Sequence, residues 1–364
     1  MKILAIETSC DDTCAAVLED DRVLSSVISS QIDLHKKWGG VVPDIAKRAH
    51  QERIGPVIME ALKRAKKQNP NPTLSLDPTG ASRAREIKEM IRDIDVIAVT
   101  VGPGLAPALG VGVNMAKELA KKYNKRLVAV NHIEGHILSN WVKNKNNLPS
   151  REIGFPALAL TVSGGHSKIV IIKKIGEYET VGETLDDAAG EALDKAAKLL
   201  GLGYPGGPVI ERVAMKGDPK FLELPKPLQD KKIMDFSFSG LKTSFYYKIK
   251  DWPKEKVNEH LADLAASFQE AVFEHLTRKF KLAIEKYQPK TLLASGGVLA
   301  NMTLRKRLRK LAKEMKLPIY MPAKKWLNTD NAAMIGVAGY YKAMRGEFVE
   351  EIEKLDRLPR WELD

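Results

Sequence analysis

The sequence contains only two cysteines, Cys10 and Cys14, in 364 residues. Two cysteines are too few for a disulfide framework, so we exclude the small disulfide-stapled domains of secreted proteins and expect reduced thiols. No apolar run is as long as a bilayer-spanning helix, and the apolar start of the chain meets Glu7 too early for a signal peptide. We therefore expect a cytoplasmic protein that is not inserted in a membrane.

Acidic residues are outnumbered, because 58 Lys and Arg stand against 46 Asp and Glu and give a formal net charge of +12. A basic balance favours a polyanionic partner such as a nucleic acid, although basic surfaces also serve solubility. The hydrophobic fraction of 44% is high enough for one large domain or two ordinary ones with buried cores. Disorder is not expected.

Two glycine turns lie at residues 163–165 and 295–297, and the second opens the expected helix that contains Asn301. Neither turn matches a Walker motif or a clean G-x-G-x-x-G, the commonest nucleotide-binding signatures. Both turns could cradle phosphates with backbone N–H groups, or could be tight turns without a ligand. Four acidic residues could hold a metal or a ribose, or cap helices: Asp11, Asp12, Asp194 and Asp330.

The expected strands follow a plan that occurs twice. Apolar runs flank polar turns at residues 3–17 and 155–172, as in β-hairpins. A strand, a glycine turn, a helix and a returning strand then follow at residues 96–131 and 291–320, which indicates two βαβ units. Such a duplication predicts two similar α/β lobes that face each other across a cleft and bind a nucleotide between them.

The repeats also predict the domain boundaries. We expect a first lobe over residues 1–131, joined by a C-terminal helical segment over residues 331–364. The second lobe should cover residues 132–330 and be the larger, because helical spacing at residues 186–202 and 261–286 predicts inserted helices.

The histidines of NHIEGH are four residues apart, so on a helix His132 and His136 share one face, as paired metal ligands do. They follow an expected strand end, where α/β proteins gather their sites; ordinary core or surface histidines are the alternative. Zincin proteases place a glutamate directly after the first histidine. Here Glu134 lies about 200° around the helix from His132 and cannot serve the same metal-bound water. A metalloprotease is therefore a minor alternative.

A basic helix is expected over residues 304–315. Its apolar stripe comprises Leu304, Leu308, Leu311 and Met315. The remaining surface carries Arg305, Lys306, Arg307, Arg309, Lys310 and Lys313. This surface is either a solvated helix face or an RNA footprint, and both interpretations stay open.

Nine motifs follow one another along nearly the whole chain: IETSCDDT, GGVVPDIAKRAH, GPGLAPALGVGV, NHIEGH, VSGGHS, LDDAAGEALDKAAKLLGLGYPGGP, DFSFSGLKT, SGGVLAN and NTDNAAM. Each motif alone would be weak, but nine in this order make chance similarity very improbable. The chain resembles the TsaD family of tRNA threonylcarbamoyltransferases, and DFSFSGLKT with HIEGH is more similar to its bacterial members than to its archaeal ones.

The resemblance implies a duplicated, two-lobed α/β fold of the actin, Hsp70 and sugar-kinase type (ASKHA) with a central cleft. It implies transfer of a threonylcarbamoyl group from threonylcarbamoyl-AMP to N6 of the adenosine next to the anticodon. The acceptors would be tRNAs that read codons beginning with A, and AMP would leave. A metal that polarises the carbamoyl carbonyl would help, because adenine N6 is a poor nucleophile.

The resemblance also implies roles for particular residues. The metal ligands would be His132, His136 and Asp330, with iron expected and zinc possible. Asp11 and His166 would lie near the reacting group as catalytic residues. Donor contacts would come from Thr161, Val162, Ser163, Gly164, Gly165, Asp194, Gly207, Glu211 and Asn301.

Bacterial relatives work with a TsaB-like paralogue and a TsaE-like ATPase, so we expect both as partners beside tRNA. A small-molecule kinase on the same fold is the main alternative and predicts no histidine metal site; a non-catalytic scaffold predicts loss of the histidine pair. Two features depart from the family pattern. Asp12 stands where glutamate is more frequent and receives no role, and the Pro- and Asn-rich residues 68–84, expected as an exposed loop, are longer than usual.

Overall fold

The computed structural model describes residues 1–66, 90–144, 146–149 and 151–363. These residues form two compact units. Unit 1 comprises residues 1–35, 41–152 and 322–363, and unit 2 comprises residues 36–40 and 153–321. The loop expected over residues 68–84 lies outside the described residues. Among the described helices, none combines the length and the apolar character that crossing a membrane requires.

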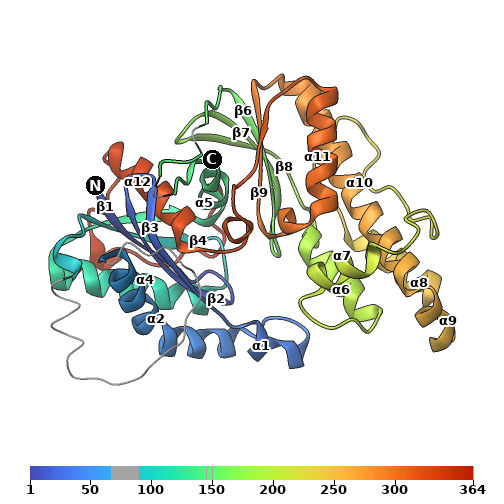
Figure 1. The fold of residues 1–364 in the computed structure, drawn as a ribbon, viewed down its shortest axis with the longest axis horizontal. Coiled ribbons are helices and arrows are strands. Elements are labelled where there is room, and N and C mark those ends of the chain that lie inside the picture. Colours follow the sequence, from blue (N-terminus) through green and yellow to red (C-terminus); the bar gives the residue numbers. More distant parts are fainter. Residues whose placement is uncertain (67–89, 145, 150, 364) are drawn as a thin grey trace. The chain divides into compact units, whose positions relative to one another are not determined.

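Unit 1 is built on a five-stranded sheet with the order β3-β2-β1-β4-β5 (Figure 1). Its strands are β1 (Lys2–Glu7), β2 (Asp12–Glu19), β3 (Arg22–Ser30), β4 (Val96–Gly102) and β5 (Arg126–Asn131). The first three strands pair antiparallel, whereas β4 and β5 are added parallel to β1. The carboxyl ends of β1, β4 and β5 therefore lie at one edge of the sheet.

Unit 2 repeats this sheet, with the order β10-β9-β6-β7-β8. Its strands are β6 (Ala157–Val162), β7 (Ser167–Lys174), β8 (Glu177–Glu183), β9 (Thr291–Ser295) and β10 (Ile319–Tyr320). Strands β6 to β8 pair antiparallel, and β9 and β10 extend the sheet parallel to β6. The two sheets have the same strand order and directions, so the duplication expected from the sequence is confirmed.

Helices cover both faces of the unit 1 sheet. They are α1 (Ile32–His35), α2 (Pro43–Lys66), α4 (Ala106–Tyr123), α5 (His132–Leu138) and α12 (Ala332–Met344). Val17 and Ile97 belong to the core cluster shared with α2 and α4, whereas Leu18 and Ala98 lie against α12. Because neighbouring strand residues point to opposite faces, α2 and α4 cover one face and α12 covers the other.

Unit 2 carries α6 (Ala189–Leu199), α7 (Gly206–Ala214), α8 (Ser239–Ile249), α9 (Lys254–Glu259), α10 (Leu261–Tyr287) and α11 (Met302–Glu314). Helices α6 and α10 match the inserted helices expected from the sequence. Six phenylalanines are completely buried in the core of this unit: Phe236, Phe238, Phe245, Phe268, Phe273 and Phe280.

Short 3-10 helices complete the chain, at Lys36–Trp38, Ser139–Trp141, Gly297–Ala300, Lys325–Leu327 and Ile352–Lys354.

The boundaries of the units differ from those of the expected lobes. We expected the second lobe to begin at His132 and to end at Asp330, but residues 132–152 and 322–330 belong to unit 1. The reason is packing, because α5 follows β5 and lies against α12. Both expected metal-ligand segments are therefore parts of one compact unit.

A buried histidine in the phenylalanine-rich core of unit 2 makes the stability of the fold depend on pH. His275 on α10 is fully buried, and its Nε2 accepts a hydrogen bond from the Ser237 N–H at 3.2 Å. Burial and the charges of Arg278 and Lys279 lower the pKa of His275 from its usual 6.5 to about 3. The folded chain therefore keeps this ring neutral at pH values where the unfolded chain protonates it.

We predict that stability falls as pH drops below 6.5, because only the unfolded chain then takes up the His275 proton. One differential proton corresponds to about 1.4 kcal/mol per pH unit, acting down to the folded-state pKa. In His275→Gln this contribution should be absent. Urea unfolding of both proteins at pH 7, 6 and 5 measures the difference in slope, and equal slopes would contradict the prediction.

Candidate active site

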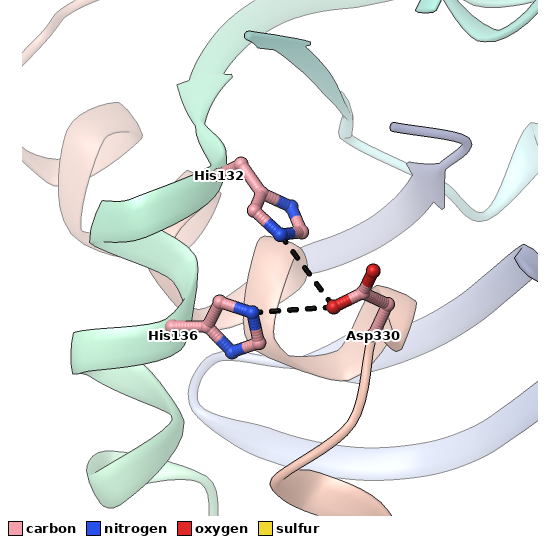
Figure 2. Close-up of side chains that lie close together, drawn as sticks. All are labelled: His132, His136 and Asp330. Carbon is pink, nitrogen blue, oxygen red and sulfur yellow. Dashed lines mark ion pairs between the residues drawn. The ribbon is translucent and has the colours of Figure 1, made fainter. Parts of the chain in front are cut away.

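The two histidines of NHIEGH lie on α5, which begins directly after β5. The side chain of Asn131 caps this helix, because its Oδ1 accepts hydrogen bonds from the N–H groups of Ile133 and Glu134 at 2.8 and 3.3 Å. The cap makes His132 the first helical residue and places His136 one turn later on the same face. The two imidazole rings are 4.7 Å apart between centroids and nearly perpendicular (Figure 2).

A carboxylate faces both rings. Asp330 directly precedes Asn331, whose side chain caps α12 by accepting the Met334 N–H at 3.0 Å. One carboxylate oxygen of Asp330 lies 3.2 Å from Nε2 of His136 and 3.5 Å from Nε2 of His132 (Figure 2). The three potential ligand atoms all lie within 4.8 Å of one another. Two imidazoles and one carboxylate with open positions suit a transition metal such as iron or zinc.

The surroundings of the His136 ring are unusual for a histidine with a purely structural role. Its ring is completely buried, Nδ1 has no hydrogen-bond partner among the described residues, and Nε2 faces the Asp330 oxygen at 3.2 Å without good hydrogen-bond geometry. Buried polar atoms are rarely left without partners, because each costs desolvation free energy. Burial also lowers the pKa of His136, which keeps a lone pair available. A neutral, unsatisfied imidazole beside a carboxylate fits a metal ligand.

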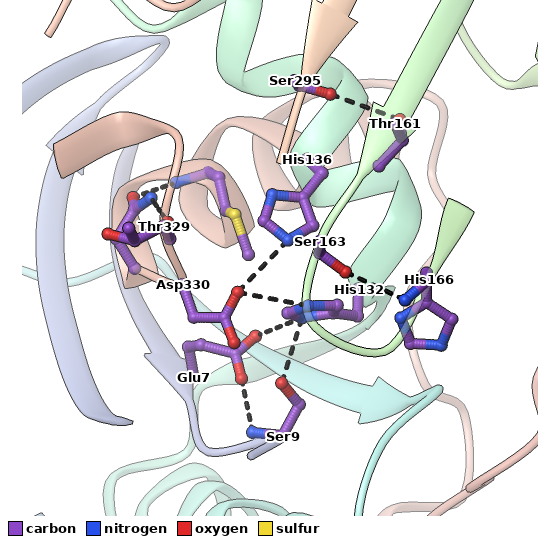
Figure 3. A network of polar contacts seen from close by, with 12 residues as sticks. Glu7, Ser9, His132, His136, Thr161, Ser163, His166, Ser295, Thr329 and Asp330 are labelled. Atoms are coloured by element: carbon purple, nitrogen blue, oxygen red, sulfur yellow. Dashed lines mark hydrogen bonds and ion pairs between the residues drawn. The ribbon is translucent and has the colours of Figure 1, made fainter. Parts of the chain in front are cut away.

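A second carboxylate orients His132 from behind. Glu7, at the end of β1, is fully buried, and its Oε2 lies 3.0 Å from Nδ1 of His132 (Figure 3). Thr100 donates to the same oxygen at 2.6 Å, and the Ser9 N–H donates to the other. Because Nδ1–H is directed to Glu7, Nε2 is the nitrogen that faces Asp330, and it offers a lone pair to a metal whenever it carries no second proton.

The charges around His132 favour a cation. Burial alone lowers the pKa of this imidazole, but the negative charges of Glu7 and Asp330 raise it to about 10. Burial alone raises the pKa of Asp330, yet the two histidines hold it well below its usual range. Two buried carboxylates thus surround a position that needs positive charge, which a proton on His132 or a divalent cation can supply.

Acidic residues of the turn after β1 lie close to this centre. Burial, followed by the charge of Asp330, raises the pKa of Asp11. Burial and the charge of Asp11 raise the pKa of Asp12 to about 7, and one Asp12 oxygen is buried without a hydrogen bond to any described residue. His50 of α2 supports the turn, with Nε2 3.0 Å from the Cys10 carbonyl oxygen.

In unit 2 the structure brings the two glycine turns together. Thr161, near the end of β6, is hydrogen-bonded to Ser295, at the end of β9, with 3.2 Å between the hydroxyl oxygens (Figure 3). Gly164 and Gly165 are exposed, and the Ser163 hydroxyl accepts the His166 N–H at 3.1 Å. Exposed backbone groups in this turn can contact a ligand.

Four further residues with expected donor contacts form one connected group in unit 2. Oδ1 of Asp194 accepts the N–H groups of Gly206 and Gly207 at 2.7 and 3.2 Å, so Asp194 holds the start of α7. Glu211, one turn further along α7, accepts the Met302 N–H at 2.7 Å. Asn301 caps α11 by accepting the Thr303 N–H at 2.9 Å. Asn301 also donates from its side-chain amide to Oε1 of Gln269 on α10 at 2.7 Å.

Comparison with known proteins shows the family. A family model described as TsaD, tRNA N6-adenosine threonylcarbamoyltransferase, matches residues 22–71 and 75–337. The chain belongs to the TsaD family. A relative of that name from Kosmotoga olearia is 45% identical over 348 residues, which cover 96% of this chain and 95% of the relative. A relative of the same name from Trichlorobacter lovleyi is 44% identical over 365 residues, covering 100% of this chain and 97% of the relative.

A solved structure supports the fold. HypF from T. kodakarensis aligns with a TM-score of 0.56 and 14% sequence identity, over 97% of this chain and 49% of HypF. At that identity the likeness concerns the fold alone, and it agrees with the ASKHA-type fold expected for a TsaD family member.

For this member of the TsaD family, the expected residues fall into two groups. Unit 1 brings together the three expected metal ligands and holds Asp11, whereas all expected donor contacts and His166 belong to unit 2. The cleft and the juxtaposition of Asp11 with His166 stay predictions. The protease alternative is not favoured, because the buried carboxylate of Glu134 lies 3.8 Å from Arg345 and 4.0 Å from Lys342.

Sequence reasoning missed the residues that support the ligands. Glu7 served only as evidence against a signal peptide, although a carboxylate that directly follows the buried apolar run of residues 3–6 is itself a signal for a buried site. Ser9, whose hydroxyl oxygen lies 3.1 Å from Nδ1 of His132, was overlooked as well. His50, in the GGVVPDIAKRAH motif, received no role.

We predict that Glu7→Gln weakens metal binding about tenfold or more, because an amide orients and polarises the His132 ring less strongly than a carboxylate does. Glu134→Gln is the matched control, since Glu134 is equally buried and lies on the helix of both histidines, but contacts Lys342 and Arg345. Titration of each purified apoprotein with Zn²⁺ in a competitive chelator assay measures the affinities. An equal loss of Zn²⁺ affinity in the two variants would show that Glu7 has only a general structural role.

Proposed function

We propose that this chain transfers the threonylcarbamoyl group of threonylcarbamoyl-AMP to N6 of the adenosine next to the anticodon. The acceptors are tRNAs that read codons beginning with A. In this reaction a bond forms between N6 and the carbamoyl carbon, the bond from that carbon to the phosphate oxygen breaks, AMP leaves, and N6 loses a proton. Support comes from the names of relatives that are 44–45% identical over nearly the whole chain.

The observation that carries the proposal is the convergence of His132, His136 and Asp330, with the unsatisfied ring of His136 among them. We assign these residues to one divalent cation, with iron as first choice and zinc as second, because two imidazoles and a carboxylate suit both. Such a cation, when bound, supplies Lewis-acid polarisation of a carbonyl oxygen. Glu7 keeps the His132 ring in the orientation that ligation requires.

The donor is assigned to unit 2. Backbone N–H groups of the exposed residues Gly164 and Gly165 suit an anionic phosphate, and the adjoining turn at residues 295–297 leads through a 3-10 helix to α11. The neighbouring helices carry three further expected contacts: α6 carries Asp194, and α7 carries Gly207 and Glu211. Binding the donor there would order the group to be transferred before the RNA arrives, which lowers the entropic part of the barrier.

Asp11 and His166 are the residues we assign to proton handling near the reacting group. The raised pKa of Asp11 suits a carboxylate that accepts a proton, because a stronger base takes up the N6 proton more readily. His166 directly follows the glycine turn, with its backbone N–H bonded to Ser163. An imidazole ring combines a hydrogen-bond donor and an acceptor, which suits proton transfer.

A cytoplasmic location, a TsaB-like paralogue and a TsaE-like ATPase belong to the same proposal. They rest on the similarity of the nine motifs to bacterial members of the family. The kinase alternative predicts no histidine metal site, whereas the three residues expected to hold a metal converge. The transferase is therefore preferred.

We predict that His132→Ala lowers both metal content and transfer about tenfold or more, because it removes one of three ligands, while the fold is retained. The assay incubates the purified chain with unmodified tRNA and threonylcarbamoyl-AMP, with and without metal and both partners, and detects the modified nucleoside by mass spectrometry. His260→Ala, which changes a half-buried histidine of unit 2, is the control.

Metal content that stays unchanged in His132→Ala, measured by elemental analysis, would refute the ligand assignment. Absence of adduct under every condition, together with ATP consumption in the presence of sugars, would favour the kinase instead.

A further inference from the structure

Helix α11 presents two different faces. Leu304, Leu308 and Leu311 are buried against the core of unit 2, as the apolar stripe predicted. Six of its thirteen residues are basic, and only Glu314 is acidic. Such a composition leaves the outward face strongly positive.

The structure divides the six basic residues into two sets. Arg305 donates to the carbonyl oxygen of Leu299 at 3.3 Å, and Arg307 is paired with Glu270 of α10, so these two side chains are engaged with the protein. The other four are exposed: Lys306, Arg309, Lys310 and Lys313. Their spacing of i, i+3, i+4 and i+7 places them on one side of the helix. We refer to these four residues as the α11 basic face.

The α11 basic face is not neutralised by the protein around it. None of its four residues forms an ion pair with any described residue, whereas some exposed lysines elsewhere in unit 2 are paired, such as Lys173 with Glu179 at 3.1 Å. Within the face, Lys306 faces Lys310 and Arg309 faces Lys313 at i, i+4, an arrangement that destabilises a helix. A cluster of four like charges that form no ion pair with a described residue fits a surface whose counter-charge comes from a bound polyanion.

The position of the face connects it to the donor residues of unit 2. Helix α11 begins at Asn301, and Glu211 accepts the N–H of its first residue, Met302. With a rise of 1.5 Å per residue, Lys306 lies about 8 Å and Lys313 about 18 Å along the helix from Asn301. The positive charge therefore starts close to the expected donor site and runs away from it along one rigid element.

We propose that the α11 basic face binds the phosphate backbone of the tRNA substrate. The proposal rests on the proposed function, because that function makes an RNA the acceptor. Contacts of lysine and arginine with phosphates fix the position of a nucleic acid without reading its sequence. The face thus holds the tRNA through charge, and the choice of the adenosine is made elsewhere.

The test replaces all four residues together, as Lys306→Gln, Arg309→Gln, Lys310→Gln and Lys313→Gln, because glutamine removes the charge and preserves helix propensity. The matched control removes four charges from other exposed sites of unit 2: Lys173→Gln, Lys174→Gln, Lys281→Gln and Lys286→Gln. Circular dichroism and thermal unfolding establish that both variants are folded. Affinity for labelled, unmodified tRNA is measured by fluorescence anisotropy between 50 and 300 mM KCl.

We expect the basic-face variant to bind tRNA about tenfold or more weakly at low salt, and the slope of log affinity against log salt to become shallower by about 3. The control variant should change affinity less than about twofold. Unchanged tRNA affinity and slope in the basic-face variant, or equal losses in both variants, would overturn the proposal and leave a solvated helix.

Failure of this proposal can be told apart from failure of the proposed function. If the wild-type chain forms the modified nucleoside but the basic-face variant binds tRNA as tightly, the surface assignment is wrong and the transferase stands. If the wild-type chain binds tRNA through the face but forms no adduct under any condition, the surface stands and the transferase is wrong.

Discussion

The contact between Glu7 and His132 is the constraint on which the candidate metal centre depends. It joins the end of β1 to the first residue of α5, at 3.0 Å between two groups with almost no solvent exposure. Each partner lowers the cost of burying the other, because an unpaired buried charge loses several kcal/mol of solvation. The parallel addition of β4 and β5 to β1 brings these strand ends to one edge, where Thr100 of β4 and the Ser9 N–H supply further hydrogen bonds to Glu7.

The position of the ligands follows from ordinary helix capping. Asn131 ends β5 and caps α5, and Asn331 caps α12, so each expected ligand segment adjoins an asparagine cap. The caps fix where each helix begins, and thereby which side chains face the centre. A shift of the α5 start by one residue would turn its two histidines about 100° around the helix axis. This is how local sequence preferences are converted into a site with ångström-scale spacing.

The parts of this arrangement differ in how far the sequence predicts them. The helical spacing of His132 and His136 is a local pattern, and so is the duplicated strand plan; both were predictable, and the sheets confirm the plan. Asp330 was assigned by family resemblance alone, because no spacing relates it to a helix almost 200 residues earlier. Glu7 was missed for the same reason, since its partner is defined by strand order. The sequence also could not show which basic residues of α11 are unpaired, because Arg307 forms an ion pair with Glu270, a residue of another helix.

The two halves share a topology and use it differently. In both, a glycine after the inner parallel strand lies too close to the end of the first strand to carry a Cβ, as shown by Gly104 against Ser9 and Gly296 against Val162. The segments after the equivalent outer strands diverge. After β5 the chain forms α5 with both histidines, whereas after β10 it returns to unit 1 at Pro322 and supplies Asp330. The candidate metal centre therefore draws its ligands from the segments after both outer strands, while the basic helix after β9 is left to face outward. A duplicated fold can in this way separate the chemistry of one half from the binding of a large substrate by the other.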